Sequence, residues 1–434
     1  MSPLLAPLFA QLVSLQLGDR TEGRYADFNG DRRYEASSAP VIGLGVSSRE
    51  TTFQLLYSPS LLMTPVDRPP RELYVFHQVA ATAGYALKRT QVSFGSSFAI
   101  GSLNLKLIGV QGVLLPANGN TVGTGVPTAS IPPTGTPTTT DAPTTGTGTT
   151  TPTPGVLPTN TPGGPVTKEP GIDQKVRFYV VTNTLAVTHL LSKNVRFTVT
   201  GSSSIASGMD EASRAFYPTL RGWSLGANTG YVYATSKRDS FNSNASFLKT
   251  WSSNDNEAAT LNLTESWLHQ FGPRTTGSIG AGFNVTRFSQ PDNLAGFSVF
   301  PTFSASASHR VPLGRGGLSF SLAAYSSPAL DPLRALVDPR VGLSGNIAYT
   351  RRKLTLSTSG GVSFSYAPEG SHASAVNSVQ GEARASYAVA SVASLDTGAR
   401  IARQTYGDAT VIPTSWAAFV GITLGYRKIL AGGR

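Results

Sequence analysis

The sequence contains no cysteine, which excludes disulfide-held scaffolds, thiolate zinc sites, iron–sulfur clusters and cysteine nucleophiles. Charged residues are scarce, at 14% of the chain, against roughly 25% in typical soluble domains. The chain also lacks a run of about 18 apolar residues, and this excludes a membrane-spanning helix. A membrane protein built from strands is still compatible, because each strand gives a much weaker hydropathy signal.

What replaces the missing charge is mostly glycine, serine and threonine. The formal net charge is +11 over 434 residues, which favours an anionic partner such as nucleic acid, lipid head groups, acidic polysaccharide or small anions. The basic residues are dispersed over predicted turns and form no recognition motif. We therefore expect no nucleic-acid partner.

Apolar and small polar residues alternate strictly over long stretches of the chain. In SIGAGFNV, residues 278–285, the side chains of Ile, Ala, Phe and Val share one face, and those of Ser, Gly and Asn share the other. This period of two predicts a strand with one apolar face. In a soluble sandwich, the alternative all-β architecture, the polar face would be rich in Lys and Glu; here it is Ser, Thr, Gly and Asn.

The connections between such segments alternate between short and long. Links such as SSRE and TRRK follow most even-numbered segments, and longer links such as DFNGDRRYEASS follow most odd-numbered ones. Outer-membrane barrels have this asymmetry, with short periplasmic turns and longer external loops. Closure of the sheet removes the unpaired strand edges that hydrocarbon does not tolerate. A helical period appears only in fragments such as Pro328–Leu336, which we expect to form a short loop turn.

We therefore predict an all-β, transmembrane antiparallel up-and-down β-barrel of about 18 strands in the bacterial outer membrane. The barrel is expected over residues 11–430, with residues 1–10 as the remnant of a signal peptide. Residues 116–173, rich in Thr, Pro and Gly, are expected to be a disordered external loop inserted within the barrel. The strands are placed near 11–24, 39–48, 51–62, 73–87, 91–107, 175–191, 194–206, 218–235, 239–251, 257–270, 275–288, 295–309, 317–326, 340–350, 353–366, 376–389, 393–406 and 412–428.

Aromatic residues give a second indication of membrane placement. Trp and Tyr residues gather near segment ends, as expected for two belts at the membrane–water interfaces. The alternative explanation for these positions is the general preference of aromatic residues for strands. The predicted belt residues are Tyr57, Tyr85, Trp223, Trp251, Trp267, Tyr349, Trp416 and Tyr426.

Several polar residues inside predicted strands share the polar face. By alternation Glu382 and Arg384 lie on one side of their strand, and we expect them to line the lumen together with Lys88, Arg400 and Gln404. Such residues tune ion preference in a pore; an ion pair that holds adjacent strands is the structural alternative. No catalytic, cofactor-binding or metal-binding residues are predicted, because the five histidines are dispersed and no nucleophile or ligand motif occurs. We expect the protein not to be an enzyme.

The segments LLYSPSLL (Leu55–Leu62) and FHQVAATAGYALKRTQVSFGSSF (Phe76–Phe98) form a strand followed by a hairpin with a basic turn. In this repeated pattern of strands and hairpins the chain resembles porin-like outer-membrane β-barrels associated with exopolysaccharide secretion. The resemblance implies an exit channel for an exported polysaccharide, in contact with outer-membrane lipid and with a periplasmic polysaccharide-export protein as partner. A general diffusion porin and a surface adhesin or structural barrel are the alternatives.

Overall fold

The computed structural model of the chain describes residues 12–28, 31–48, 50–64, 66, 72–104, 175–192, 194–216, 219–232, 238–253, 255–289, 295–331, 336–365, 376–406 and 411–431. The predicted signal-peptide remnant and the Thr/Pro/Gly-rich loop lie outside these residues.

The described chain is almost entirely strand. The strands are β1 (Leu12–Phe28), β2 (Asp31–Ser38), β3 (Val41–Ser47), β4 (Thr51–Thr64), β5 (Glu72–Ala86), β6 (Thr90–Asn104), β7 (Lys175–Leu190), β8 (Val195–Gly208), β9 (Leu220–Val232), β10 (Asp239–Ser252), β11 (Glu257–Gly272), β12 (Thr275–Ser289), β13 (Ala295–Leu313), β14 (Gly316–Asp331), β15 (Leu336–Arg351), β16 (Leu354–Ser365), β17 (Val376–Ala390), β18 (Ala393–Tyr406) and β19 (Val411–Ala431), with one short helix, α2 (Glu211–Phe216).

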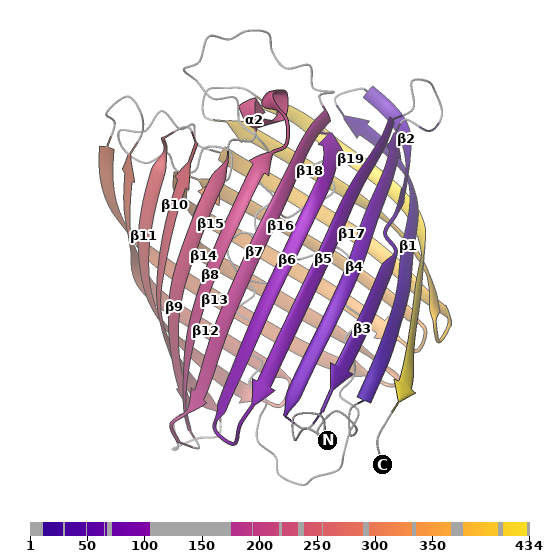
Figure 1. Ribbon diagram of the computed structural model, residues 1–434. Helices are drawn as coiled ribbons and strands as arrows, with labels where there is room; N and C mark the ends of the chain where they lie inside the picture. Colours follow the sequence, from indigo (N-terminus) through magenta and orange to yellow (C-terminus); the bar gives the residue numbers. More distant parts are fainter. Residues whose placement is uncertain are drawn as a thin grey trace, which may run out of the picture.

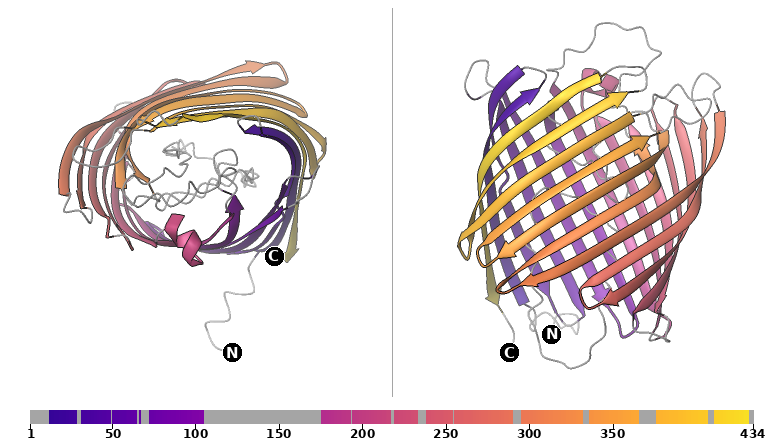
Figure 2. Two further views of the ribbon diagram at one scale, coloured as in Figure 1. Left: turned by 90° about the horizontal axis from the view of Figure 1, so that it is seen from above. Right: turned by 180° about the vertical axis from the view of Figure 1, so that it is seen from behind.

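The strands form one closed antiparallel barrel (Figures 1 and 2). From β3 onward each strand pairs with the next along the chain, and β1 pairs with β19 to close the ring. β2 and β3 share a single position, because the upper half of β1 pairs with β2 and its lower half with β3. The nineteen labelled strands therefore occupy eighteen positions around the wall, which confirms the predicted architecture.

The two rims of the barrel differ in their connections. The rim where β1 starts and β19 ends, at the bottom of Figure 1, carries the short turns, and we name it the short-turn rim. Two-residue turns link β13 to β14 and β15 to β16 there, with φ of 59° at Gly314 and 50° at Arg352. Positive φ suits the tight hairpins that join twisted strands. The opposite end is the long-loop rim.

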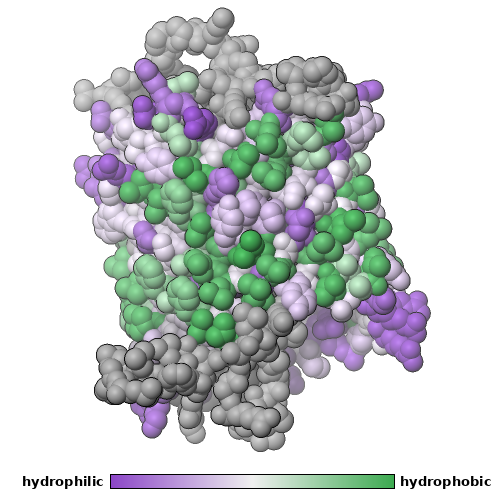
Figure 3. Space-filling view, turned by 45° about the vertical axis from the view of Figure 1, so that its right-hand side comes forward, coloured by the Kyte–Doolittle hydropathy of each residue, from purple (hydrophilic) through white to green (hydrophobic). Residues whose placement is uncertain are grey.

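Large apolar side chains cover the outward face of the wall. In β12 Phe283 is 45% exposed, whereas its neighbour Asn284, on the inward face, is fully buried. Figure 3 shows apolar residues spread over the middle of one side, with hydrophilic residues toward the ends. Such exposure would cost a soluble protein stability and suits a wall surrounded by hydrocarbon.

The strand boundaries depart from expectation in two regions. Residues 31–38 were predicted to be part of a loop, but they pair with β1 as β2, because the buried Glu35 finds its partner in Arg24 of β1. The helical turn predicted for Pro328–Leu336 is wrong: Pro328–Asp331 continue β14 and pair with β15. Among the described residues, a short helix, α2, lies between β8 and β9. It follows Asp210, whose carboxylate accepts a hydrogen bond from the Ser213 amide (2.7 Å).

No helix within the described ranges has the length and hydropathy needed to cross a bilayer.

Candidate functional site: a ladder of paired charges on the inner wall

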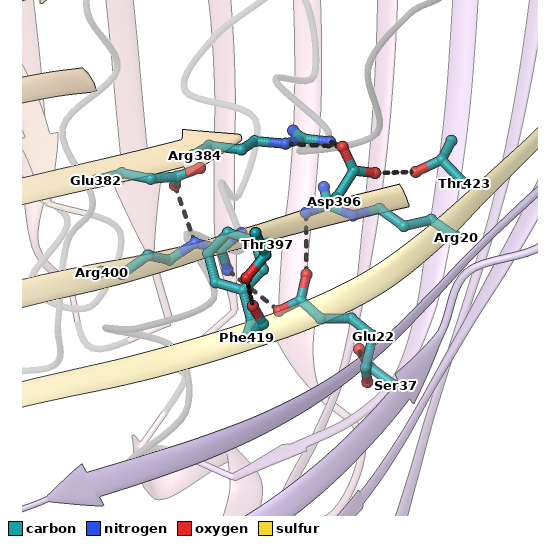
Figure 4. Close-up of polar contacts among 10 residues, drawn as sticks. All are labelled: Arg20, Glu22, Ser37, Glu382, Arg384, Asp396, Thr397, Arg400, Phe419 and Thr423. Carbon is teal, nitrogen blue, oxygen red and sulfur yellow. Dashed lines mark hydrogen bonds and ion pairs between the residues drawn. The ribbon is translucent and has the colours of Figure 1, made fainter. Parts of the chain in front are cut away.

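Nine charged residues gather on the inward face around the seam where β19 meets β1. Figure 4 shows those of β17 and β18 together with Arg20 and Glu22 of β1. They come from β17, β18, β1 and β2, and β19 contributes Phe419 and Thr423 between them. We call this set the charge ladder. Its members are Arg20, Glu22, Arg24, Arg33, Glu35, Glu382, Arg384, Asp396 and Arg400.

Strand alternation places these side chains on one face. Arg20, Glu22 and Arg24 occupy every second position of β1, and the intervening positions lie on the face that also carries the exposed Leu17. The antiparallel register then brings partners together, with Glu382 directly opposite Arg400. Residues almost 380 positions apart in the chain become neighbours because the barrel closes.

The β17–β18 part of the ladder contains two ion pairs of different burial. Arg400 Nε donates to Glu382 Oε2 at 2.9 Å, and these side chains are 21% and 35% exposed. Arg384 Nη2 lies 2.8 Å from Asp396 Oδ1, and Asp396 is only 1% exposed. Asp396 Oδ2 also accepts a hydrogen bond of 2.7 Å from the Thr423 hydroxyl. The first pair is accessible from the barrel interior, and the second is built into the wall.

The ladder continues across the seam through Arg400. Its Nη1 lies 3.8 Å from Glu22 Oε1 on β1, and its guanidinium carbon lies 4.5 Å from the centroid of the Phe419 ring. Gly421 stands between β18 and β1, where an added Cβ would lie 3.4 Å from the Cβ of Glu22. The small residue on β19 therefore leaves room for the charges of its neighbours to meet.

On β1 and β2 the ladder is buried most deeply. Arg24 pairs with Glu35, whose other oxygen lies 3.2 Å from Arg33 Nε and accepts a hydrogen bond from the Thr64 hydroxyl, also at 3.2 Å. Glu35 is fully buried. The Glu35 carboxylate compensates for the desolvation of the two guanidinium groups, and its removal would leave two buried cations facing each other. This part of the ladder therefore holds β1 and β2 together.

Taken together, five guanidinium groups face four carboxylates, so the ladder is almost neutral. A wall of this kind presents hydrogen-bond donors and acceptors without a strong net field, and it stabilises neighbouring strands through charge-assisted bonds. Among the described residues, no group of three or more His, Asp or Glu side chains could hold a metal ion.

The structure brings three of the five predicted lumen residues together in the ladder: Glu382, Arg384 and Arg400. Gln404 lies on the same strand as Arg400, with its backbone paired to Ser378. Lys88 is apart from the ladder, exposed in the turn between β5 and β6 at the short-turn rim.

The remaining six ladder residues were not predicted. For Arg20, Glu22 and Arg24 a signal was available in GDRTEGRYAD, residues 18–27, where charges of alternating sign recur at every second position of β1. Arg33 and Glu35 lie in β2, which was predicted to be part of a loop. Asp396 gave a weaker signal, because a single acid in a strand does not reveal its partner.

The predicted belt aromatics share the outward face of their strands. Trp223, Trp251 and Trp416 lie toward the long-loop rim and Tyr426 toward the short-turn rim, each within five residues of a strand end. Trp416 packs against Tyr25, with ring centroids 5.4 Å apart, and Tyr25 packs in turn against Tyr34 at 5.1 Å.

Tyr85, Trp267 and Tyr349 lie toward the short-turn rim. Tyr57 is different, because it occupies the middle of β4 and its hydroxyl is 2.8 Å from His77 Nδ1.

Comparison with known proteins places the chain in a family. The model of the EpsX exopolysaccharide export family matches residues 135–430, which contain β7 to β19. The chain belongs to this family. None of the curated proteins compared with it matches.

Three solved structures that overlap with this EpsX-family chain share little sequence identity with it, and one of them, OpdK, is an outer membrane protein. The FrpB iron transporter from Neisseria meningitidis (F3-3 variant) is 9% identical with a TM-score of 0.49, and the overlap covers 93% of this chain but only 63% of the transporter. OccK5 (OpdH) from Pseudomonas aeruginosa is 12% identical, with 97% and 99% of the two chains covered and a TM-score of 0.41. OpdK from the same organism is 9% identical, with 96% and 99% covered and a TM-score of 0.45. Overlaps this loose carry no conclusion about function.

The closed wall, its apolar exterior and the family together identify an outer-membrane β-barrel channel whose outer surface contacts membrane lipid.

Proposed function

We propose that this EpsX-family barrel is the exit conduit through which a secreted polysaccharide crosses the outer membrane. The observation that carries the proposal is the family match over residues 135–430. The inner face supports it, because its Ser, Thr and Asn side chains offer weak hydrogen bonds that sugar hydroxyls can exchange one after another.

The charge ladder suits the passage of a polymer. Each carboxylate in it has a guanidinium partner, so the wall does not hold an anionic or a cationic chain by a strong net charge. Glu382 and Arg400, the more accessible pair, contribute polar contacts at the wall together with Arg384. The belt aromatics anchor the barrel at the two membrane interfaces.

A blocked lumen tests the proposal directly. The chain has no cysteine, so a single introduced thiol is labelled selectively. Ser359 lies on the inward face opposite Glu382, and its neighbour Thr358 lies on the outward face with Leu356. We expect Ser359→Cys carrying a bulky polyethylene-glycol maleimide to stop appearance of surface polysaccharide in cells.

Two controls accompany this experiment. Ser359→Cys capped with a small maleimide is expected to export normally, and Thr358→Cys is expected to resist labelling because it faces lipid. Normal export by cells whose barrels are fully labelled with the bulky reagent, or by cells lacking the gene, would exclude the conduit.

A periplasmic polysaccharide-export protein is the proposed partner at the short-turn rim. Arg351, Arg352 and Lys353 form an exposed basic turn between β15 and β16 on that side, which fits a partner with an acidic upper surface. We expect replacement of all three by Glu to abolish co-purification of the partner at low salt while the barrel still folds. Unchanged co-purification would contradict this docking site.

A further inference from the structure

Six basic side chains project from the outward face near the long-loop rim. Each lies within four residues of the end of its strand at this rim, on the face that carries the exposed apolar side chains of the same wall. The acidic residues on this face of the described strand ends are Asp27 and Glu257. We name the six basic residues the outer collar: Arg32, Arg177, Arg221, Lys249, Arg287 and Arg403.

The collar is densest on β9, β10 and β12. Lys249 is opposite Trp223 on one side and Ala259 on the other, and Ala259 is opposite Arg287. Lys249 and Arg287 therefore share one row across three strands. Lys249 Nζ also pairs with Glu257 Oε1 at 2.7 Å.

The two arginines of this group have no acid opposite them. Arg221 is opposite Trp251 and Ile205. Arg287 is opposite Ala259 and Phe297. Both side chains are exposed, and they project where the wall leaves hydrocarbon.

Aromatic rings border the same cluster. Trp223 packs against Phe247 with ring centroids 5.0 Å apart, directly beside Lys249. At the boundary between the hydrocarbon and the head groups, aromatic side chains contact acyl chains and nearby cations contact head groups. The cluster has this arrangement. A basic residue at this depth costs about 0–1 kcal/mol by itself, and it becomes favourable when a phosphate lies beside it.

The long-loop side of an outer-membrane barrel is the external side. The outer leaflet there consists largely of lipopolysaccharide, whose sugar anchor carries phosphates just above its acyl chains. Arginine binds phosphate through two parallel hydrogen bonds, and lysine binds it as a point charge. We propose that Arg221, Lys249 and Arg287 form a binding site for the phosphates of this outer-leaflet glycolipid.

Binding of two lipid A preparations tests the site. The full-length barrel in detergent is titrated with bisphosphorylated lipid A and with the same lipid after dephosphorylation, and bound lipid is counted by native mass spectrometry. We expect the wild-type protein to prefer the phosphorylated lipid. Arg221→Gln/Lys249→Gln/Arg287→Gln should bind it about 30-fold more weakly. Each of the two arginines contributes roughly a factor of five near a lipid surface, and Lys249 contributes little because it already pairs with Glu257.

The matched control removes three charges from the opposite rim. Arg89, Arg274 and Arg315 are exposed in short turns, and Arg89→Gln/Arg274→Gln/Arg315→Gln should bind phosphorylated lipid A as the wild type does. Equal binding of the two lipids by the wild type, or equal losses in the two triple variants, would overturn the site.

If the collar variant fails to fold, judged by its mobility on unheated gels, the wild-type comparison of the two lipids still decides, together with Arg287→Gln alone. The collar and the charge ladder lie on opposite faces of the wall. Failure of this test therefore leaves the conduit proposal unaffected, and failure of the conduit leaves the lipid site unaffected.

Discussion

Replacement of Asp396 by asparagine probes how much the inner charge ladder stabilises the seam. The carboxylate is 1% exposed and accepts bonds from Arg384 and from the Thr423 hydroxyl. Asparagine keeps the shape and the bond from Thr423, but it removes the charge that Arg384 faces. Loss of one partner of a buried pair costs about 3–5 kcal/mol. Because the Arg384 side chain is 22% exposed and can partly hydrate, we expect about 2 kcal/mol.

The accessible pair of the same ladder provides the comparison. Glu382 is 35% exposed, and Glu382→Gln should cost only about 0.5–1 kcal/mol, as exposed ion pairs do. The free energies of unfolding are measured by guanidinium titration of the refolded barrel in detergent, with tryptophan fluorescence as the probe.

The double variant Arg384→Gln/Asp396→Asn sharpens the test. It leaves no unpaired charge, so it should be more stable than the sum of the single variants predicts, by about 1 kcal/mol or more. Equal costs for Asp396→Asn and Glu382→Gln, or strict additivity in the double variant, would refute the assignment of Asp396 as a structural partner in the wall.

Three further outcomes are expected. A Cβ on Gly282 would collide with the backbone carbonyl of Leu263, while one on Gly425 meets nothing within 4 Å; Gly282→Ala should therefore cost about 1–3 kcal/mol in the same titration, and a neutral result would contradict the close approach of β11 and β12. Glu382→Gln should shift the reversal potential in a salt gradient across a planar bilayer toward anion preference, because it leaves Arg400 without its nearest carboxylate; a shift toward cations would count against its place on the conducting path. Hydrogen bonds from the Ser213 side chain and backbone lower the pKa of Asp210. Its capping of α2 is therefore complete above the ordinary pKa of 3.8 and is lost as the pH falls through the lowered value. Asp210→Ala should speed amide exchange over residues 211–216 at neutral pH, with an effect that shrinks as the pH falls below 3.8, and equal protection at neutral pH would exclude the cap.

The presence of most strands, and the face of the sheet on which each of their side chains lies, were predictable from the sequence alone. Alternation is a local property, since each side chain's face depends only on its place in the pleat, so SIGAGFNV reveals its outward side without reference to any partner. The eighteen positions and the two unequal rims followed from the same pattern. Failures occurred where local signals were weak: β2 lacks a clean apolar row, and Pro328–Asp331 carries a proline in a strand.

The pairing of charges, by contrast, was decided by the tertiary structure. The sequence marks Glu382, Arg384 and Arg400 as polar members of one face, yet nothing in it says that Glu22 lies beside Arg400. That contact exists because the last strand pairs with the first, and the register of the closing seam is set by the whole circumference of the barrel. The composition of the chain and its two-residue alternation determined that it forms a barrel with an apolar outer surface. Only the closure of the barrel determined which charged residues come into contact.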